Sequence, residues 1–263
     1  MATRNFLFGL DNDDVALTRF LETAARVTGF LKGAPGEALP GWYVPGGDNE
    51  HFLRELYRRL EATYPAAGQP FYAVRLLTNL FWQPAYIAVI GTHVHGALPR
   101  LSSVSQQAKG IDVSGFRLPA GPQHKADLDA LIFRAGTDLR AFADGLLVEI
   151  NAVTKLRRVP ALRLVTDRML GLMVRLRDYV PGMTIEEQRH LCMLWLSAMD
   201  LVGQGDLETL DLADGRQVLI TARKGCCLDY LAFPDVYCSS CPKQDDEIRL
   251  TRQRDEALAE LDA

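Results

Sequence analysis

Four of the five cysteines of this chain lie between Arg223 and Pro242, and this clustering constrains the fold more than any other sequence feature. They are Cys226, Cys227, Cys238 and Cys241. A chain of 263 residues can bury a substantial core without disulfide staples, so stability alone does not require them. In a reducing cytosol, clustered cysteines are more often metal ligands or redox catalysts than structural disulfides.

Four roles are compatible with such a cluster. A structural disulfide pair is disfavoured by the length of the chain and by the expected compartment. A catalytic dithiol of the thioredoxin type would need only Cys238 and Cys241, at the start of a helix that follows a strand. A hairpin pattern before the cluster and Pro242 after it argue against that context. A structural zinc ion and an iron–sulfur cluster remain, because each is held by four thiolates.

The spacing favours the iron–sulfur cluster over zinc and leaves zinc open. Zinc sites usually pair two separated Cys-x2-4-Cys turns, whereas Cys226 and Cys227 are adjacent. In extended backbone their side chains leave opposite faces, so directing both at one small ion requires a local bend. A two-iron cluster spreads its ligand positions over two metals, and it accommodates an adjacent pair more easily. Cysteine followed by proline, as at Cys241, also recurs in bacterial ferredoxins.

The composition is that of an ordinary soluble protein, with 48% hydrophobic residues, 24% charged residues and a net charge of -4. Nucleic-acid binders usually carry a basic patch, so a nucleic-acid partner is not expected. The first fourteen residues lack the apolar core of a signal peptide, and we expect a cytoplasmic protein. The most apolar stretch, residues 76–98, is interrupted by polar residues, so no transmembrane segment is expected. Peripheral contact with the inner membrane stays open.

Helical periodicity dominates the first part of the chain. We expect a helix over residues 17–31 behind an acidic segment, a loop over 33–47, and a second helix capped by Asp48. The apolar stretch should form a buried helix that Pro84 kinks or restarts. Alternating apolar residues between Leu101 and Leu118 predict short strands or a hairpin.

The rest of the chain adds helices and a second hairpin. Apolar stripes predict helices over 128–153 and 165–180, and Thr184 with Glu187 forms a capping box for the next one. A hairpin is expected around Asp214-Gly215, and an amphipathic helix from Asp245 onward. The predicted fold is therefore helix-rich α+β. Its predicted division is a helix-rich body over 1–204 and a unit of hairpin, cysteine loop and final helix over 205–263.

The pattern CC-x10-C-x2-C, preceded by Arg223 and with Tyr230 soon after the first pair, resembles the FhuF-like ferric siderophore reductases. The resemblance is specific over Arg223 to Pro242 and loose elsewhere. It implies that Cys226, Cys227, Cys238 and Cys241 are the ligands of a [2Fe-2S] cluster. It also implies that the body over 1–204 binds a ferric siderophore, with hydroxamates favoured.

One-electron reduction of chelated Fe(III) would lower its charge and its preference for oxygen ligands, and so release Fe(II). No G-x-G-x-x-G after a strand and no P-loop motif is present, so the sequence shows no nucleotide site. The electron is therefore expected from an external redox protein, such as a ferredoxin, a flavodoxin or a reductase. The alternative function is a zinc-stabilised binding or assembly module without redox activity.

Residues near the cluster have two interpretations each. Arg223 and Lys224 either tune the cluster and dock the electron donor, or form a solvated strand end. Tyr230 and Phe233 are expected to shield the cluster from water, with contact to the chelate as the alternative. Cys192 matches no position of the motif and lies on an apolar helical face, so we expect a core residue.

Residues elsewhere carry weaker signals. His93 and His95 would share a face in extended backbone and could flank a chelate, although a loop or capping role is favoured. Trp82 and Tyr86 lie one turn apart on the apolar helix, where such stripes are usually core.

Overall fold

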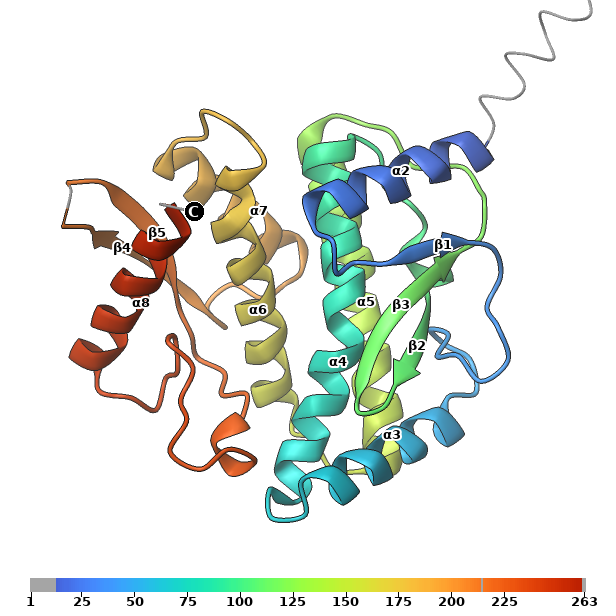
Figure 1. Cartoon of the computed structure of the whole chain (residues 1–263). Helices are drawn as coiled ribbons and strands as arrows, with labels where there is room; N and C mark the ends of the chain where they lie inside the picture. The colour runs from blue at the N-terminus through green and yellow to red at the C-terminus, as the bar shows by residue number, and fades with distance from the viewer. Residues whose placement is uncertain (1–12, 214, 262–263) are drawn as a thin grey trace, which may run out of the picture.

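The structure is a computed structural model that describes residues 13–213 and 215–261. It confirms a helix-rich α+β fold (Figure 1). The helices are α2 (Asp13–Val27), α3 (Glu50–Thr63), α4 (Gly68–Ile90), α5 (Leu128–Val153), α6 (Arg158–Val174), α7 (Ile185–Ala198) and α8 (Asp246–Leu261). The strands are β1 (Gly33–Pro35), β2 (Ser105–Lys109), β3 (Asp112–Leu118), β4 (Asp206–Asp211) and β5 (Gln217–Ala222). Shorter turns are η1 (Gly91–His95), η2 (Leu101–Ser103), η3 (Arg175–Asp178) and η4 (Asp229–Leu231).

Helices α4 to α7 form the centre of the molecule, with the sheet β1-β3-β2 on one side and β4, β5 and α8 on the other (Figure 1). The main hydrophobic core runs from Leu17 to Leu201 and takes most of its side chains from these helices. The apolar stretch over 76–98 is a buried helix as far as Ile90, because α4 is covered on nearly all sides, and its last residues form the turn η1 and the chain that follows it. Within the described residues, no helix combines the length and the apolar character needed to cross a membrane.

Helix α4 does not restart at Pro84, so that alternative of the prediction was wrong. Helix α4 runs through Pro84 to Ile90 and continues into the π-helical turn η1. A proline removes the N–H that would bond to the carbonyl four residues earlier, here that of Leu80. The buried side chain of Gln106 supplies the missing donor, because its Nε2 lies 3.0 Å from the Leu80 carbonyl oxygen. The Leu80 carbonyl therefore keeps a hydrogen-bond donor although Pro84 has no N–H.

Two predictions in the N-terminal part were also wrong. The stretch 33–47 is not all loop, because β1 pairs in parallel with β3 and Gly33 lies opposite Phe116. A Cβ atom on Gly33 would lie 2.3 Å from the Phe116 ring, so only glycine allows this approach. Asp48 does not cap α3, whose N-cap residue is Asn49. The Asn49 side chain instead bonds to Val44 in the preceding loop.

The middle of the chain follows the sequence pattern closely. Strands β2 and β3 form the predicted hairpin, and α5 covers the predicted range 128–153. The next helix, α6, ends earlier than its apolar stripe, because a 3-10 turn begins at Arg175. The predicted capping box is present: Thr184 accepts from the Glu187 N–H at 3.1 Å, and Glu187 accepts from the Thr184 N–H at 2.8 Å.

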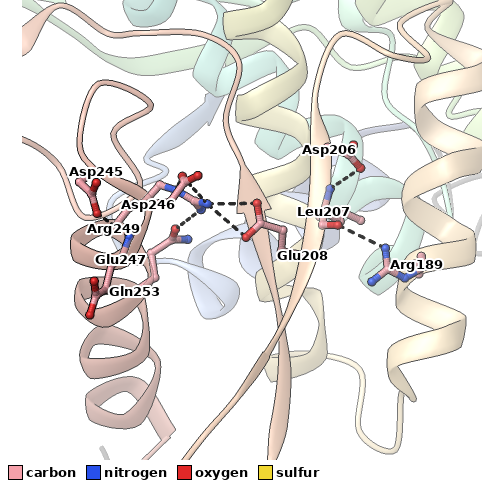
Figure 2. Close-up of polar contacts among 9 residues, drawn as sticks. All are labelled: Arg189, Asp206, Leu207, Glu208, Asp245, Asp246, Glu247, Arg249 and Gln253. Atoms are coloured by element: carbon pink, nitrogen blue, oxygen red, sulfur yellow. Dashed lines mark hydrogen bonds and ion pairs between the residues drawn. The ribbon is translucent and has the colours of Figure 1, made fainter.

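Strands β4 and β5 form the predicted second hairpin, with Asp214 of its expected turn outside the described residues. Helix α8 packs on this hairpin around a second small hydrophobic cluster. Figure 2 shows the buried Arg249 of α8 bonding to both carboxylate oxygens of Glu208 in β4, at 3.1 and 3.2 Å. On the other side of β4, Arg189 of α7 donates to the carbonyl of Leu207. The division at residue 204 stays a prediction.

Candidate metal centre in the cysteine loop

The cysteine loop, residues 223–244, is anchored to helix α6 by one buried carboxylate. Asp167 projects from α6, and its side chain is only 3% exposed. It accepts hydrogen bonds from the backbone N–H of Gly225 at 2.7 Å and of Lys224 at 3.3 Å. The guanidinium of Arg223 lies 3.5 Å from the same carboxylate. The loop therefore leaves strand β5 with its first residues fixed against the helical body.

The backbone around the first cysteine pair is shaped by two residues. At Gly225, a Cβ atom would lie 2.8 Å from an Asp167 oxygen and 2.9 Å from the Leu164 nitrogen. Glycine is therefore required for the loop to approach α6 this closely. Directly after the pair, Leu228 adopts the left-handed conformation with φ of 61°. The chain therefore turns sharply directly after the pair and enters the short helical turn η4.

The sulfur atoms of the loop interact with one another. Cys227 accepts hydrogen bonds from the thiols of Cys226 and Cys238, which hold its pKa far below the ordinary thiol value. The same hydrogen bonds, together with burial, raise the pKa of Cys226 and of Cys238. The charge of Cys241 adds to both upward shifts. Cys226 and Cys238 are thus hydrogen-bonded to Cys227, and Cys241 lies close enough for its charge to act on Cys226 and Cys238.

Backbone and cationic donors surround these sulfurs. The N–H of Leu228 bonds to Cys226, and the N–H of Asp229 bonds to Cys227. Arg223 donates to the Cys238 sulfur at 3.5 Å. Burial lowers the pKa of Arg223, but Asp167 and the sulfurs of Cys238 and Cys227 outweigh it and the net shift is upward. Such donors favour thiolates over thiols, so Arg223 is more than a solvated strand end.

The second cysteine pair forms a compact turn. The N–H of Cys241 bonds to the carbonyl of Cys238 at 3.0 Å, which closes the turn. Gln244 reinforces it by donating to the same carbonyl at 2.7 Å. Ser239 inside the turn donates to Glu256, so helix α8 holds the turn from outside. Cys241 is buried, whereas the other three cysteines of the loop are half-buried.

Aromatic and charged contacts fix the spacer between the two pairs. Tyr230 stacks on Tyr237 with ring centroids 5.8 Å apart, and Lys243 lies over the Tyr230 ring. Phe233 is partly exposed and contacts Tyr64 at the start of the helical body. These contacts order the spacer, whereas the expected role of Tyr230 and Phe233 as a shield against water stays a prediction.

A second ion pair joins the spacer to helix α4. Arg75 lies 3.5 Å from Asp229. Burial, together with the charge of Cys227, raises the pKa of Asp229 to about 6, although Arg75 opposes this shift. The spacer is therefore tied to α4 as the first cysteine pair is tied to α6.

The donor set fits a thiolate-bound metal group. Four converging cysteines, N–H donors to two of them and an arginine beside a third are the surroundings that iron–sulfur and zinc–thiolate sites use. Among residues 13–213 and 215–261, however, no three His, Cys, Asp or Glu side chains are arranged to hold a metal ion as they stand. The metal-binding role of the four cysteines therefore stays a prediction.

A pocket of about 280 Å³ opens beside the cysteine loop. Its walls come from α6, β5 and α8, and Ser239 and Ser240 of the second cysteine turn reach it. Arg223 lines the pocket and also contacts the Cys238 sulfur. A molecule in this pocket would thus lie directly beside the predicted metal ligands.

The histidines proposed to flank a chelate lie away from this pocket, in the turn η1. Nε2 of His93 accepts a hydrogen bond from the Trp195 indole at 2.8 Å, and burial lowers the pKa of His93 to about 4. His95 contacts Gln123 at 2.9 Å. Both histidines therefore have partners within the protein, in a helix-end turn rather than in extended backbone.

The remaining candidates divide between core and surface. Cys192 is fully buried in α7, as predicted for a core residue, and burial raises its pKa to about 12. Trp82 and Tyr86 are only half-buried, and Phe30 packs against both. Tyr86 also lines the pocket, so the core interpretation holds only in part.

Asp167 and Arg75 contact the cysteine loop, and Arg168 lines the pocket beside it, but the sequence analysis missed all three. Asp167 interrupts the apolar stripe of α6, and a lone carboxylate on a buried helical face is a signal that could have found it. Arg75 and Arg168 lie in helices far from the cysteines in sequence, and no local pattern connects them to the loop.

No family model matches this chain, and no solved structure matches its fold. The likeness of Arg223 to Pro242 to the FhuF-like reductases is a prediction from the sequence.

Proposed function

We propose that this protein is a cytoplasmic ferric siderophore reductase that holds a [2Fe-2S] cluster on Cys226, Cys227, Cys238 and Cys241. The observation that carries the proposal is the convergence of these four cysteines beside a pocket that can admit a small molecule. The resemblance of the cysteine motif supports the same assignment. The reaction adds one electron to chelated Fe(III), and weaker binding of Fe(II) by the oxygen ligands releases it to the cell.

When bound, a [2Fe-2S] cluster with four thiolate ligands supplies single electrons at low potential, about -400 mV in plant-type ferredoxins. The residues of the chain set its surroundings. Arg223, beside Cys238, favours the more negative state of the group and so raises its potential, whereas the buried Asp167 opposes this effect. Tyr230 and Tyr237 limit water on the spacer side. An external redox protein supplies the electron, because the chain has no nucleotide motif.

The decisive test is the metal content of protein purified without oxygen. We expect a brown protein with equal amounts of iron and acid-labile sulfide, and reduction of ferric chelates by a reduced donor. Single Cys→Ser changes at positions 226, 227, 238 and 241 should abolish the visible spectrum and the reductase activity together, because each removes a thiolate ligand.

Cys192→Ala is the matched control, since it removes a fully buried cysteine outside the loop. The spectrum and activity should survive it. Ferric reductase activity that persists in the four Cys→Ser variants would refute the proposal. Zinc without sulfide in anaerobically purified protein would select the alternative, a zinc-stabilised binding or assembly module.

A further inference from the structure

The pocket beside the cysteine loop contains four arginines, namely Arg168, Arg175, Arg177 and Arg223. Arg168 is accessible to solvent, yet protein surrounds it on most sides, so its side chain lies in a recess rather than on a convex surface. Such a recess concentrates the field of the charges that line it.

Arg168 has no acidic partner. In the part of the chain that the structure describes, no carboxylate forms an ion pair or a hydrogen bond with it. Burial lowers its pKa, and the charges of Arg223, Arg75 and Arg175 lower it further, while only the Tyr86 phenol opposes the shift. Each of these three arginines is paired with a carboxylate, Arg223 with Asp167, Arg175 with Glu260 and Arg75 with Asp229, so the unneutralised positive charge among them is that of Arg168. An anion beside Arg168 would neutralise this charge.

The acidic residues of the pocket do not meet this need, because each is engaged elsewhere. Asp167 accepts from Gly225 and pairs with Arg223. Glu260 pairs with Arg175 at 2.8 Å, and Glu256 accepts from Ser239. Arg168 is therefore the cation that a bound anion would neutralise.

The size and shape of the pocket favour a small molecule over a protein. A volume of about 280 Å³ is near the lower end of the range for small-molecule sites, roughly 300–1,000 Å³, and it suits one face of a chelate. A smaller hollow of about 70 Å³ shares Tyr86, Leu172 and Arg175 with it, and Phe30 and Tyr179 also line this hollow. Arginine and aromatic rings together suit an anion that carries aromatic rings.

We infer that the Arg168 pocket selects ferric chelates with a net negative charge, and catecholates in particular. The inference rests on the proposed function for its substrate class, and it departs from the hydroxamates that the sequence resemblance implies. Three dianionic catecholates leave a ferric complex with three negative charges, whereas three monoanionic hydroxamates leave it neutral. Arg168 can pair with the oxygens of the first complex but gains little from the second.

The test uses gallium(III) complexes, which copy the size and charge of ferric chelates but cannot be reduced under these conditions. The protein as isolated is titrated by calorimetry with a hexadentate gallium tris-catecholate and a hexadentate gallium trihydroxamate. We expect the anionic complex to bind roughly tenfold more tightly or better, which is the size of effect that one charged hydrogen bond produces. Arg168→Gln should remove this preference, because it removes the charge. Arg168→Lys should retain part of it.

Arg163→Gln is the matched control, because it removes the same charge from an exposed position of α6 outside the pocket. It should bind both complexes as the wild type does, and thermal unfolding should show that all variants are folded. Equal affinity of the wild type for the two complexes would overturn the inference. So would slower electron uptake by Arg168→Gln with unchanged chelate binding, since the pocket would then dock an acidic donor protein.

Binding of gallium complexes does not depend on a redox-active cluster, so the two proposals fail separately. A protein without iron and sulfide that still prefers the anionic complex would defeat the reductase and leave the pocket assignment. An iron–sulfur protein that binds both complexes equally would defeat the pocket assignment and leave the reductase proposal standing.

Discussion

Asp167 connects the cysteine loop to the helical body through a single carboxylate. Burial raises its pKa, although Arg223 and the N–H groups of Gly225 and Lys224 oppose the shift. A buried carboxylate is costly unless it is bonded, and Asp167 is bonded on both oxygens. Asp167 therefore holds the chain on α6 directly before the first cysteine pair.

His93 predicts a pH dependence of stability. Its Nε2 accepts the Trp195 N–H, which requires a neutral ring, and burial lowers its pKa from 6.5 to about 4. Below pH 6.5 the imidazole of His93 takes up a proton in the unfolded chain, whereas in the folded chain it stays neutral down to about pH 4. The free energy of unfolding should therefore fall as pH drops through this window, by up to roughly 3 kcal/mol from this group.

Urea unfolding at several pH values checks this prediction. In His93→Gln the amide oxygen can still accept from Trp195, but nothing titrates at this position. The difference between wild type and variant should change between pH 6.5 and 4 and be constant above pH 7. A constant difference throughout would show that His93 is protonated as easily in the folded chain as in the unfolded one.

At the level of single residues, the sequence identified the cysteines of the loop but few of the residues that contact them. Local spacing made Cys226, Cys227, Cys238 and Cys241 visible as a group. The contacts of Asp167 and Arg75 with the loop depend on how α6 and α4 pack, and spacing along the chain carries no information about that. The pocket around Arg168 was invisible for the same reason.

The passage of α4 through Pro84 predicts a coupling between two elements. Gln106→Met should leave the Leu80 carbonyl buried without a donor and destabilise the protein by about 1–3 kcal/mol. Pro84→Ala restores a backbone N–H to the same carbonyl. The double variant should therefore recover much of the loss, and a double-mutant cycle by urea unfolding measures this coupling.

Pro84→Ala alone is the control, and a small effect is expected because the Gln106 donor is still present. If the two losses simply add in the double variant, Gln106 does not replace the missing hydrogen bond.

Elements with a complete local pattern were predicted well. Helix α5 has its full apolar stripe, α7 has a capping box, and each predicted hairpin is present as an antiparallel pair of adjacent strands. The errors fall where a distant contact decides the structure. Strand β1 forms through its pairing with β3. Helix α3 begins after Asn49 rather than Asp48, and the Asn49 side chain bonds to the preceding loop.

At the scale of the molecule, the described residues form a main hydrophobic cluster from Leu17 to Leu201 and a small one around β4, β5 and α8. The cysteine loop lies between them and contains little apolar core of its own. Removal of the metal group proposed for the four cysteines should therefore loosen residues 223–244 and spare α4 and α5.

Hydrogen exchange before and after metal removal, under reducing conditions, measures this effect by segment. Faster exchange confined to the loop and the neighbouring hairpin is expected. Equal loss of protection in α4 and α5 would mean that the metal holds the entire fold together.

Strand β5 forms part of the pocket wall through Leu219, Ile220 and Thr221 and then continues into the cysteine loop. Only a few residues of one backbone, clamped at Gly225, separate the wall from Cys226. A molecule that displaced this strand would therefore pull on the Asp167 anchor before it moved the thiol pair. Occupation of the pocket would leave the cysteines in place for as long as that anchor holds.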